Sequence, residues 1–290
     1  MNEPATDTST SQNGSLDTYR HIARGYDLLA SSYDQDVGSN AVGQRMRDVF
    51  REILRRNFAA RQTVFEIGCG TGIDALWLAR LGVDVVATDI SQEMVDVLSK
   101  KAKAEGLADR IRVAKLRASE IGRLARDYGE ESFGGGYCHA GALNMEPALE
   151  LVPSQVRQLV RRGGAFVCSV INKTSLFELL FYPLVLRPRK AFRRLGNVVP
   201  IPISREPPLN RYVVPARFYS PGEVAALFRP DFSVEALQGL QILLPPANLS
   251  EYYIALGPIF AAVEVVERHI ARLPPMNGWG HHSILTLRRS

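Results

Sequence analysis

Cysteine is scarce in this sequence, and its scarcity excludes two classes of protein. Among the 290 residues only Cys69, Cys138 and Cys168 are cysteines, and no two of them form a C-x-x-C pair. A disulfide-stabilised fold and a zinc cluster of cysteines are therefore not expected, and we predict no metal site. Free thiols are typical of a reducing compartment, so we expect the protein to be cytoplasmic.

Long apolar runs are also missing. A membrane-spanning helix needs about 18 apolar residues, and the longest candidate, 176–186, is interrupted by Glu178 and Pro183. The first residues, 1–18, are polar and lack the apolar centre of a signal peptide. We therefore expect a disordered lead-in over 1–18 and a single domain over 19–290.

The composition is that of a globular protein, with 46% hydrophobic and 22% charged residues. A chain of this length can bury a large core without disulfides or metals. The net charge of +5 is modest, but the positive residues are concentrated. Residues 176–217 contain eight Arg or Lys against two Glu, and seven of the seventeen prolines.

Hydrophobic periodicity predicts strands that alternate with helices. Two helices, over 19–34 and 45–58, come first. Five strands are predicted at 63–67, 83–88, 110–116, 133–140 and 165–171, and the helices between them at 73–81, from Ser91 onward, 118–128 and 149–160. A helix at 220–228, an extended run at 232–244, a helix at 251–273 and a strand at 282–287 follow the proline-rich segment. This alternation predicts an α/β fold, doubly wound around a mostly parallel sheet.

A glycine-rich loop gives the sharpest indication of chemistry. The run Glu66-Ile-Gly-Cys-Gly-Thr-Gly72 directly follows the first strand and opens a helix. Glycines let the backbone turn sharply and approach a ligand, and the amides at a helix start attract electronegative groups. Asp89 ends the second strand, where an acid can bind ribose hydroxyls. A dinucleotide site is disfavoured, because its G-x-G-x-x-G pattern would need glycine where Ile73 stands.

These motifs resemble those of the class I S-adenosylmethionine-dependent methyltransferases. The family's E-x-G-x-G-x-G motif matches FEIGCGTG, and its ribose-binding acid matches ATDIS, with Met94 shortly after. The resemblance implies a Rossmann-like, seven-stranded sheet with N-terminal helices and an insertion after the fifth strand. It also implies S-adenosyl-L-methionine as cofactor, bound by Glu66, Gly68, Cys69, Gly70, Gly72, Asp89, Ile90, Met94, Ala118 and Ser119.

One departure from the family lies after the third strand. Family members often carry an acid there near the adenine amino group, and here Arg117 stands in its place. Ser119 or the backbone of Ala118 are the candidates to replace that contact. Upstream, the run 25–34 resembles a helix that folds over the cofactor in many small-molecule methyltransferases. That resemblance places Tyr33 at the active site, although helical spacing equally allows a core position.

Chemistry on the acceptor is predicted from residues that follow the strands. His139 ends the fourth strand, where the ligand crevice of a parallel sheet lies, and is the candidate general base. A cofactor-flanking or core position is the alternative for it. Asn144 and Asn172 either orient the substrate or shape turns. His281 and His282 are expected as surface residues of a turn.

The rest of the chain divides around this core. We expect an N-terminal helical cap at 19–60, the cofactor-binding core at 61–172, and substrate-side insertions at 173–218 and 245–275. Pro245, Pro246, Tyr252 and Tyr253 are candidates to line the acceptor pocket. Residues 176–194 are apolar and then basic, which is typical of a cover over a lipophilic substrate or of a peripheral membrane contact. A solvated basic helix face is the alternative.

The sequence thus predicts methyl transfer from S-adenosylmethionine to a small, lipophilic or aromatic acceptor by in-line displacement. Two alternatives remain open: an RNA methyltransferase, and a catalytically silent S-adenosylmethionine-binding protein. We expect no nucleic-acid partner, because no RNA-binding module is present. The chain also reads Gly141-Ala-Leu-Asn144 where amino-group methyltransferases of nucleic acids carry N-P-P-Y or D-P-P-Y.

Overall fold

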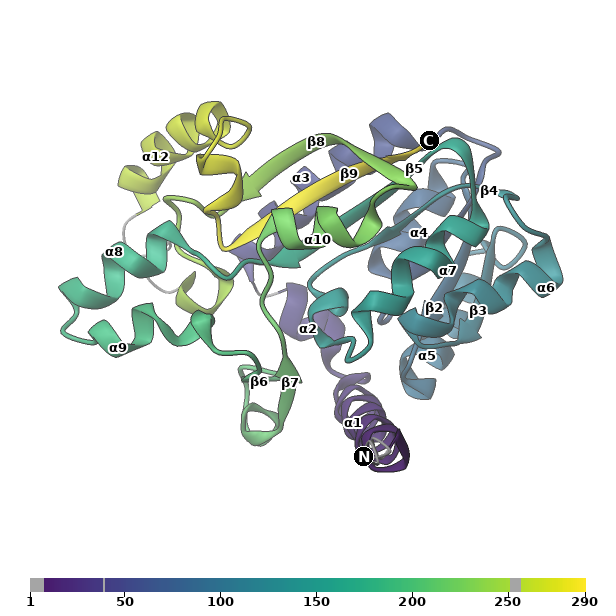
Figure 1. Ribbon diagram of the computed structural model, residues 1–290, viewed down its shortest axis with the longest axis horizontal. Helices are drawn as coiled ribbons and strands as arrows, with labels where there is room; N and C mark the ends of the chain where they lie inside the picture. Colours follow the sequence, from purple (N-terminus) through teal and green to yellow (C-terminus); the bar gives the residue numbers. More distant parts are fainter. Residues whose placement is uncertain (1–7, 39, 251–256) are drawn as a thin grey trace, which may run out of the picture.

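A seven-stranded sheet forms the centre of the molecule (Figure 1). The computed structural model describes residues 8–38, 40–250 and 257–290. The strands, in the order in which they lie, are β3 (Ile111–Lys115), β2 (Asp84–Asp89), β1 (Thr63–Ile67), β4 (Phe133–Cys138), β5 (Val160–Ile171), β9 (His282–Arg289) and β8 (Phe232–Leu240). β1 to β5 are mutually parallel, and β9 runs antiparallel to both of its neighbours. The predicted fold class is confirmed.

Helices cover both faces of the sheet, so the central strands are buried on both sides, as is typical of parallel sheets. One face is covered by α3 (Ala41–Asn57), α4 (Ile73–Arg80) and α5 (Gln92–Ala104), whose core includes Phe50 and Leu54. The other is covered by η1 (Ala118–Leu124), α6 (Ala125–Tyr128), α7 (Val152–Leu159) and α10 (Pro221–Phe228). Side-chain caps start several of these helices: the Ser91 hydroxyl accepts from the Met94 amide before α5.

The N-terminal helices differ from the prediction. α1 spans Thr8–Leu29 and α2 spans Tyr33–Gly38, with a turn where one continuous helix was expected. The expected disorder of residues 8–18 is wrong, because α1 begins at Thr8. Once a helix is nucleated, each further residue adds a hydrogen bond, and no proline interrupts the chain between Thr8 and Tyr19.

The insertion after β5 contains helices and a small ribbon. It comprises α8 (Leu176–Leu184), α9 (Pro188–Ala191), η4 (Arg193–Leu195), β6 (Val199–Pro202), η5 (Leu209–Arg211) and β7 (Val213–Ala216). β6 and β7 pair as an antiparallel two-stranded sheet. Sequence reasoning missed this ribbon because proline is unfavourable within a sheet, whereas an isolated ribbon has two open edges that tolerate it.

Other boundaries also shift. β5 starts at Val160 rather than Ala165, and an irregularity in its pairing with β4 follows Phe133. β8 ends at Leu240 rather than Leu244, because Gln241 has φ +56°, which an extended strand excludes. The predicted helix at 118–128 is mostly 3₁₀, as η1.

Short elements complete the chain: η2 (Ala142–Met145), η3 (Leu149–Leu151), η6 (Ala247–Leu249), α12 (Gly257–Ile270) and η7 (Met276–Gly278). α12 occupies most of the helix predicted at 251–273. Tyr252 and Tyr253, the candidate pocket residues, lie outside the described residues.

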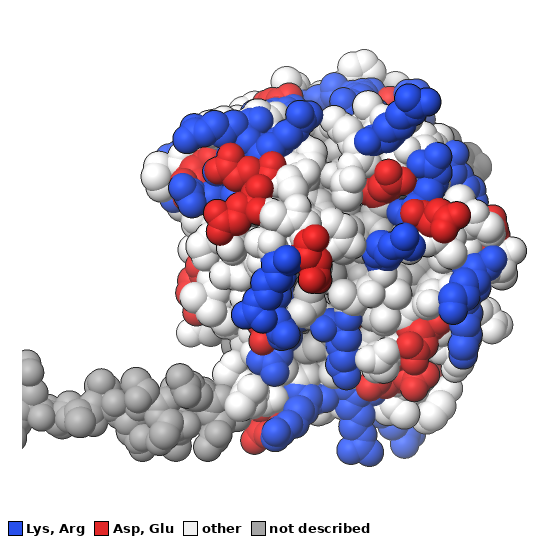
Figure 2. Space-filling view, turned by 90° about the vertical axis from the view of Figure 1, so that its right-hand side faces the viewer, with Lys and Arg blue, Asp and Glu red and all other residues white. Residues whose placement is uncertain are grey.

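The described helices include none with the combination of length and apolar character that crossing a bilayer would take. On the face shown in Figure 2, Lys and Arg side chains alternate with Asp and Glu side chains. This face therefore lacks the uniform positive field that favours binding to a nucleic-acid backbone.

A substitution at Gly136 would test the packing of the central sheet. A Cβ at this position in β4 would lie 2.2 Å from the Phe65 ring, which is fully buried between strands and helices. We expect Gly136→Ala to lower the free energy of unfolding by roughly 1–3 kcal/mol, the usual cost of overpacking, measured by urea denaturation. Gly134→Ala is the matched control, because its Cβ meets only the Gln62 side chain, at 3.3 Å. Equal stability of the two variants would contradict this packing.

Candidate functional site

A cavity of about 720 Å³, its open mouth included, lies at the carboxyl ends of β1, β2 and β4. Crevices at this edge of a parallel sheet are the usual ligand sites. The predicted site residues that line it are Tyr33, Gly68, Gly70, Asp89, Ile90, Met94, Ala118 and His139. The other predicted residues, Glu66, Cys69, Gly72 and Ser119, are not among those that line the cavity in the part of the chain described here.

The glycine loop forms the floor of this cavity. Gly68 and Gly72 have φ of +70° and +82°, which L side chains rarely adopt. A Cβ at Gly68 would lie 2.5 Å from the Cβ of Ala142, and one at Gly72 would lie 2.0 Å from Leu98. Both glycines are therefore required by backbone conformation and by packing, before any ligand is considered.

Glu66 lies beneath the loop. It is 2% exposed, and burial, followed by the charge of Asp74, raises its pKa well above the ordinary value. Its Oε2 has no hydrogen-bond partner among the described residues, and neither has the nearby Tyr137 hydroxyl. The carboxyl group therefore belongs to the support of the loop rather than to the cavity wall.

Asp89 connects the loop to the next helix. Its Oδ2 accepts a hydrogen bond from the Gly70 amide and its Oδ1 accepts one from the Ser91 amide, both at 2.9 Å. Burial raises the pKa of Asp89, against the backbone N–H groups that lower it. Each carboxylate oxygen can accept a further hydrogen bond, so the group can bind two neighbouring hydroxyls from the cavity.

The N-terminal helices close the cavity over the loop. The Ser91 hydroxyl donates to Asp27 of α1 and the Thr71 hydroxyl donates to Asp34 of α2, both at 2.5 Å. Asp34 also forms an ion pair with Lys101. Tyr33 lies against the position that a Gly70 Cβ would take, at 3.6 Å. The position of Tyr33 is compatible with both an active-site and a packing role, since its side chain packs on the glycine loop and also borders the cavity.

A carboxylate that sequence reasoning missed lies at the Arg117 end of the cavity. Glu146 is 6% exposed and lines the cavity. Its carboxylate accepts from the Ser119 amide at 3.2 Å and from the Tyr19 hydroxyl, while the Arg117 guanidinium lies 4.4 Å from the Tyr19 ring. An acid is thus present near the position where family members often carry one and this chain has Arg117. No local pattern marks it, because 27 residues separate it from Ser119.

His139 borders the cavity and forms a pair with Asp74. Its Nδ1 lies 2.9 Å from Oδ2 of Asp74, and its ring stacks on Phe50 with 4.0 Å between centroids. Asp74 also binds Arg47 and Arg51. Burial would raise the pKa of Asp74, but the hydrogen bond with His139 and the charges of Arg47 and Arg51 hold it below its ordinary value.

This pairing fixes the tautomer of His139. An ionised Asp74 can only accept, so Nδ1 carries the proton and Nε2 keeps its lone pair. Burial is the largest cause that lowers the pKa of His139 below 6.5, and the charges of Arg47 and Arg51 add to it. Nε2 is buried and has no partner among the described residues. The ring is therefore a neutral proton acceptor at pH 7.

Polar groups on β5 and β9 share the sheet face of His139. Tyr137 pairs with Val167 and Ile171 pairs with His282, so by alternation His139, Ser169 and His282 point to the face covered by α3. The Ser169 hydroxyl is also buried without a described partner. Two unpartnered polar atoms, Ser169 Oγ and His139 Nε2, thus belong to adjacent strands on one face.

The expectation that His281 and His282 are surface residues is wrong. They are 9% and 7% exposed, and their Nδ1 atoms lie 2.8 Å apart. Burial lowers the pKa of His282 to about 3, so its ring is neutral at pH 7. The cause is topological: β9 lies between β5 and β8, and the start of an interior strand is covered.

Asn144 and Asn172 are structural rather than exposed to a ligand. The Asn144 side chain exchanges hydrogen bonds with the Ile171 backbone and donates to the Arg217 carbonyl. The Asn172 amide donates to the Gly280 carbonyl and to the Ser283 hydroxyl, each at 2.8 Å. The three cysteines are buried and unpaired. Within the described ranges, no group of three or more His, Cys, Asp or Glu side chains is arranged to hold a metal ion.

Comparison with known proteins agrees with this geometry. Residues 64–164 match a family model described as a methyltransferase domain. Methyltransferase GfsG of Streptomyces halstedii is 28% identical over 139 residues, 47% of each chain. A ubiquinone biosynthesis O-methyltransferase of Roseobacter denitrificans is 34% identical over 116 residues, 38% of this chain and 41% of that protein. The chain therefore spans about half the length of these curated relatives.

Solved structures show the same fold. The [4+2]-cyclase SpnF superposes with a TM-score of 0.61 at 15% identity, over 93% of this chain and 96% of that one. A geranyl diphosphate C-methyltransferase of Streptomyces coelicolor gives 0.56 at 14% identity, over 89% and 84%. At such identities the likeness extends to the fold alone.

The state of His139 can be measured directly. We expect its ring to titrate below pH 6.5, with Nδ1 protonated in the neutral form, because Asp74 accepts from Nδ1 and burial disfavours the cation. Nitrogen-15 NMR of the imidazoles checks this, with His139→Gln to assign the signal. In Asp74→Asn the preference for the Nδ1 tautomer should weaken, since an amide can also donate. A midpoint above 6.5, or a proton on Nε2 at neutral pH, would rule out the assigned tautomer.

Proposed function

We propose that the protein transfers a methyl group from S-adenosyl-L-methionine to a small acceptor, a proposal supported by the match of residues 64–164 to a methyltransferase-domain model. The observation that carries the proposal is the joint position of Asp89 and His139 on one cavity. Asp89 offers two carboxylate oxygens that can bind a diol, and His139 offers Nε2, a nitrogen that can accept a proton. When bound, the cofactor supplies a methyl group on a positively charged sulfur, which is a strong electrophile.

The cavity fits this cofactor in its chemistry. The Asp89 oxygens suit the two ribose hydroxyls, and the backbone of Gly68 and Gly70 borders the cavity without a side chain. Ile90, Met94 and Leu116 supply apolar surface for the adenine. Glu146, held by Ser119 and Tyr19, takes the place of the acid that Arg117 replaces. Glu66, Cys69 and Gly72 then act through the shape of the loop rather than by contact.

The acceptor binds on the His139 side in this proposal. Tyr33, Tyr26 and Met145 give the cavity an aromatic and apolar lining, which suits a lipophilic or aromatic molecule. His139 Nε2 accepts the proton that a hydroxyl acceptor loses as its oxygen is methylated. Asp74 then stabilises the imidazolium through Nδ1, because it is an ionised carboxylate at hydrogen-bond distance. The relative named for O-methylation in ubiquinone biosynthesis supports a hydroxyl acceptor.

The location of the protein is part of the same proposal. Three unpaired cysteines are typical of a reducing compartment, which favours the cytoplasm. A lipophilic acceptor concentrates in bilayers, so a contact of residues 176–194 with a membrane would bring the protein to its substrate.

Thermal unfolding in the presence of ligands tests the cofactor. A ligand at a hundred times its dissociation constant stabilises a protein by about 2.7 kcal/mol. We expect S-adenosylmethionine and S-adenosylhomocysteine to raise the melting temperature and NAD to leave it unchanged. Asp89→Ala should remove the shift, because the ribose hydroxyls lose their acceptors.

Asp84→Ala is the matched control, since Asp84 begins the same strand and pairs with Arg110 on the surface, 3.0 Å away. It should keep the full shift. Stabilisation by NAD alone, or an unchanged shift in a folded Asp89→Ala variant, would refute the ribose assignment.

Loss of the base should affect turnover and leave cofactor binding intact. We expect His139→Ala to lower kcat with a hydroxyl acceptor by roughly 10²–10⁴-fold, the usual contribution of a general base. Formation of S-adenosylhomocysteine with a panel of phenols measures this, and the exposed His269→Ala serves as control. Cofactor binding without turnover on any acceptor would favour the silent binding protein instead.

A further inference from the structure

The helical hairpin after β5 exposes an apolar surface. We call residues 176–198, which contain α8, α9 and η4, the cap hairpin, and they lie at the far left of the molecule in Figure 1. Its most exposed apolar side chains are Leu184 (80%), Leu186 (89%), Phe192 (59%), Leu195 (63%) and Val198 (61%). Large exposed apolar side chains gathered on one hairpin are typical of an interaction site.

The charges that surround this surface are positive. Arg187, in the turn between α8 and α9, and Arg189 and Lys190, in α9, are exposed. The acid of the cap hairpin is Glu178, which is fully buried. Apolar and cationic groups are thus presented together, with no exposed carboxylate between them.

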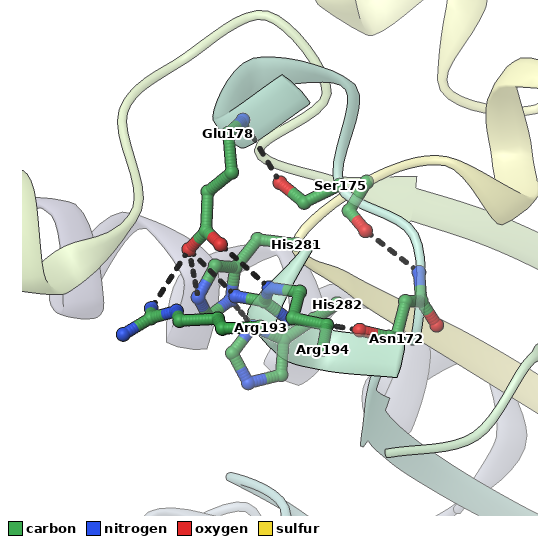
Figure 3. Close-up of polar contacts among 8 residues, drawn as sticks. Asn172, Ser175, Glu178, Arg193, Arg194, His281 and His282 are labelled. Atoms are coloured by element: carbon green, nitrogen blue, oxygen red, sulfur yellow. Dashed lines mark hydrogen bonds and ion pairs between the residues drawn. The ribbon is translucent and has the colours of Figure 1, made fainter. Parts of the chain in front are cut away.

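A buried ion pair holds the cap hairpin against the sheet (Figure 3). Arg194 donates two hydrogen bonds to the Glu178 carboxylate, each 2.8 Å long, and a third, of 2.9 Å, to the Asn172 carbonyl at the end of β5. Arg193 adds a bond to Glu178 at 3.1 Å. Breaking a buried pair costs several kcal/mol, so the exposed leucines are presented on a fixed support.

We propose that the cap hairpin docks on the surface of an anionic lipid bilayer. Leu184 and Leu186 enter the boundary between headgroups and acyl chains, and Arg187, Arg189 and Lys190 bind the lipid phosphates. A second copy of the chain is disfavoured as occupant, because in a two-fold contact this positive surface would face itself. The proposal concerns binding alone and stands whether or not the protein transfers methyl groups.

Co-sedimentation with vesicles tests it on the full chain. We expect binding to vesicles of equal parts phosphatidylcholine and phosphatidylglycerol, weakened by salt, and little binding to phosphatidylcholine alone. Replacing Arg187, Arg189 and Lys190 by Gln should weaken binding roughly fivefold for each charge, on the order of a hundredfold in all. Leu184→Ser with Leu186→Ser should weaken it at least tenfold, because the apolar contact is lost.

Two matched controls separate this surface from general effects. Lys100, Lys103 and Arg126 are exposed basic residues on α5 and α6, and their replacement by Gln removes the same charge elsewhere. Leu151→Ser removes an exposed leucine, 51% accessible, before α7. Both should bind vesicles like the unaltered protein.

Equal binding to neutral and anionic vesicles, or equal losses in the control variants, would overturn the proposal. So would absence of binding to anionic vesicles by a folded protein that still unfolds cooperatively. If the leucine variant instead changes the sedimentation of the protein without lipid, the surface is an interface between copies of this chain. Retention of the S-adenosylmethionine thermal shift in every variant would keep this result separate from the cofactor site.

Discussion

One buried carboxylate, that of Asp74, organises the centre of this molecule. It lies in the first turn of α4, directly after the glycine loop, and receives hydrogen bonds from Arg47 and Arg51 of α3 and from His139. A carboxylate at a helix start is favourable, because the backbone amides there are partly positive. Its burial is tolerated because two guanidinium groups compensate its charge. Loop, helix α3 and the end of β4 are thereby joined at a single point.

The remaining features of the cavity depend on this cluster around Asp74. Arg47 also influences the ionisation of Tyr33 of α2 through its charge, so the electrostatics of this cluster extend to the residue that packs on the glycine loop. His139 has its proton on Nδ1 because Asp74 accepts there. A neutral imidazole beside two arginines is the consequence of burial and of their charges, and not a property of the histidine alone. The solved structures of similar fold include a cyclase, so the chemistry is decided by such side chains rather than by the fold.

The sequence allowed prediction wherever the relevant residues are neighbours along the chain. The glycine loop and Asp89 end consecutive strands, and the expected sheet brings them together without knowledge of side chains. Glu146 and the Asp74–His139 pair were not foreseen, because their partners are 27 and 65 residues away in sequence. The burial of His282 was not predicted for a related reason. Two histidines beside a glycine are typical of an exposed turn, and only the position of β9 as an interior strand shows that they are covered. The helix from Thr8 was missed because its polar composition carries no hydrophobic period.

The order of strands has a consequence for how the chain folds as it is synthesised. β8 pairs with β9 alone, and β9 also completes the hydrogen bonds of β5. β8 is complete at Leu240, but its partner strand β9 begins only at His282. While the residues between them are synthesised, the nascent chain therefore carries β8 as an unpaired strand and β5 as an open edge of the sheet. Exposed edges of this kind invite pairing with other chains. The parallel part of the sheet, β1 to β5, can form earlier, whereas β9 and β8 join it only after residues 282–289 have emerged from the ribosome.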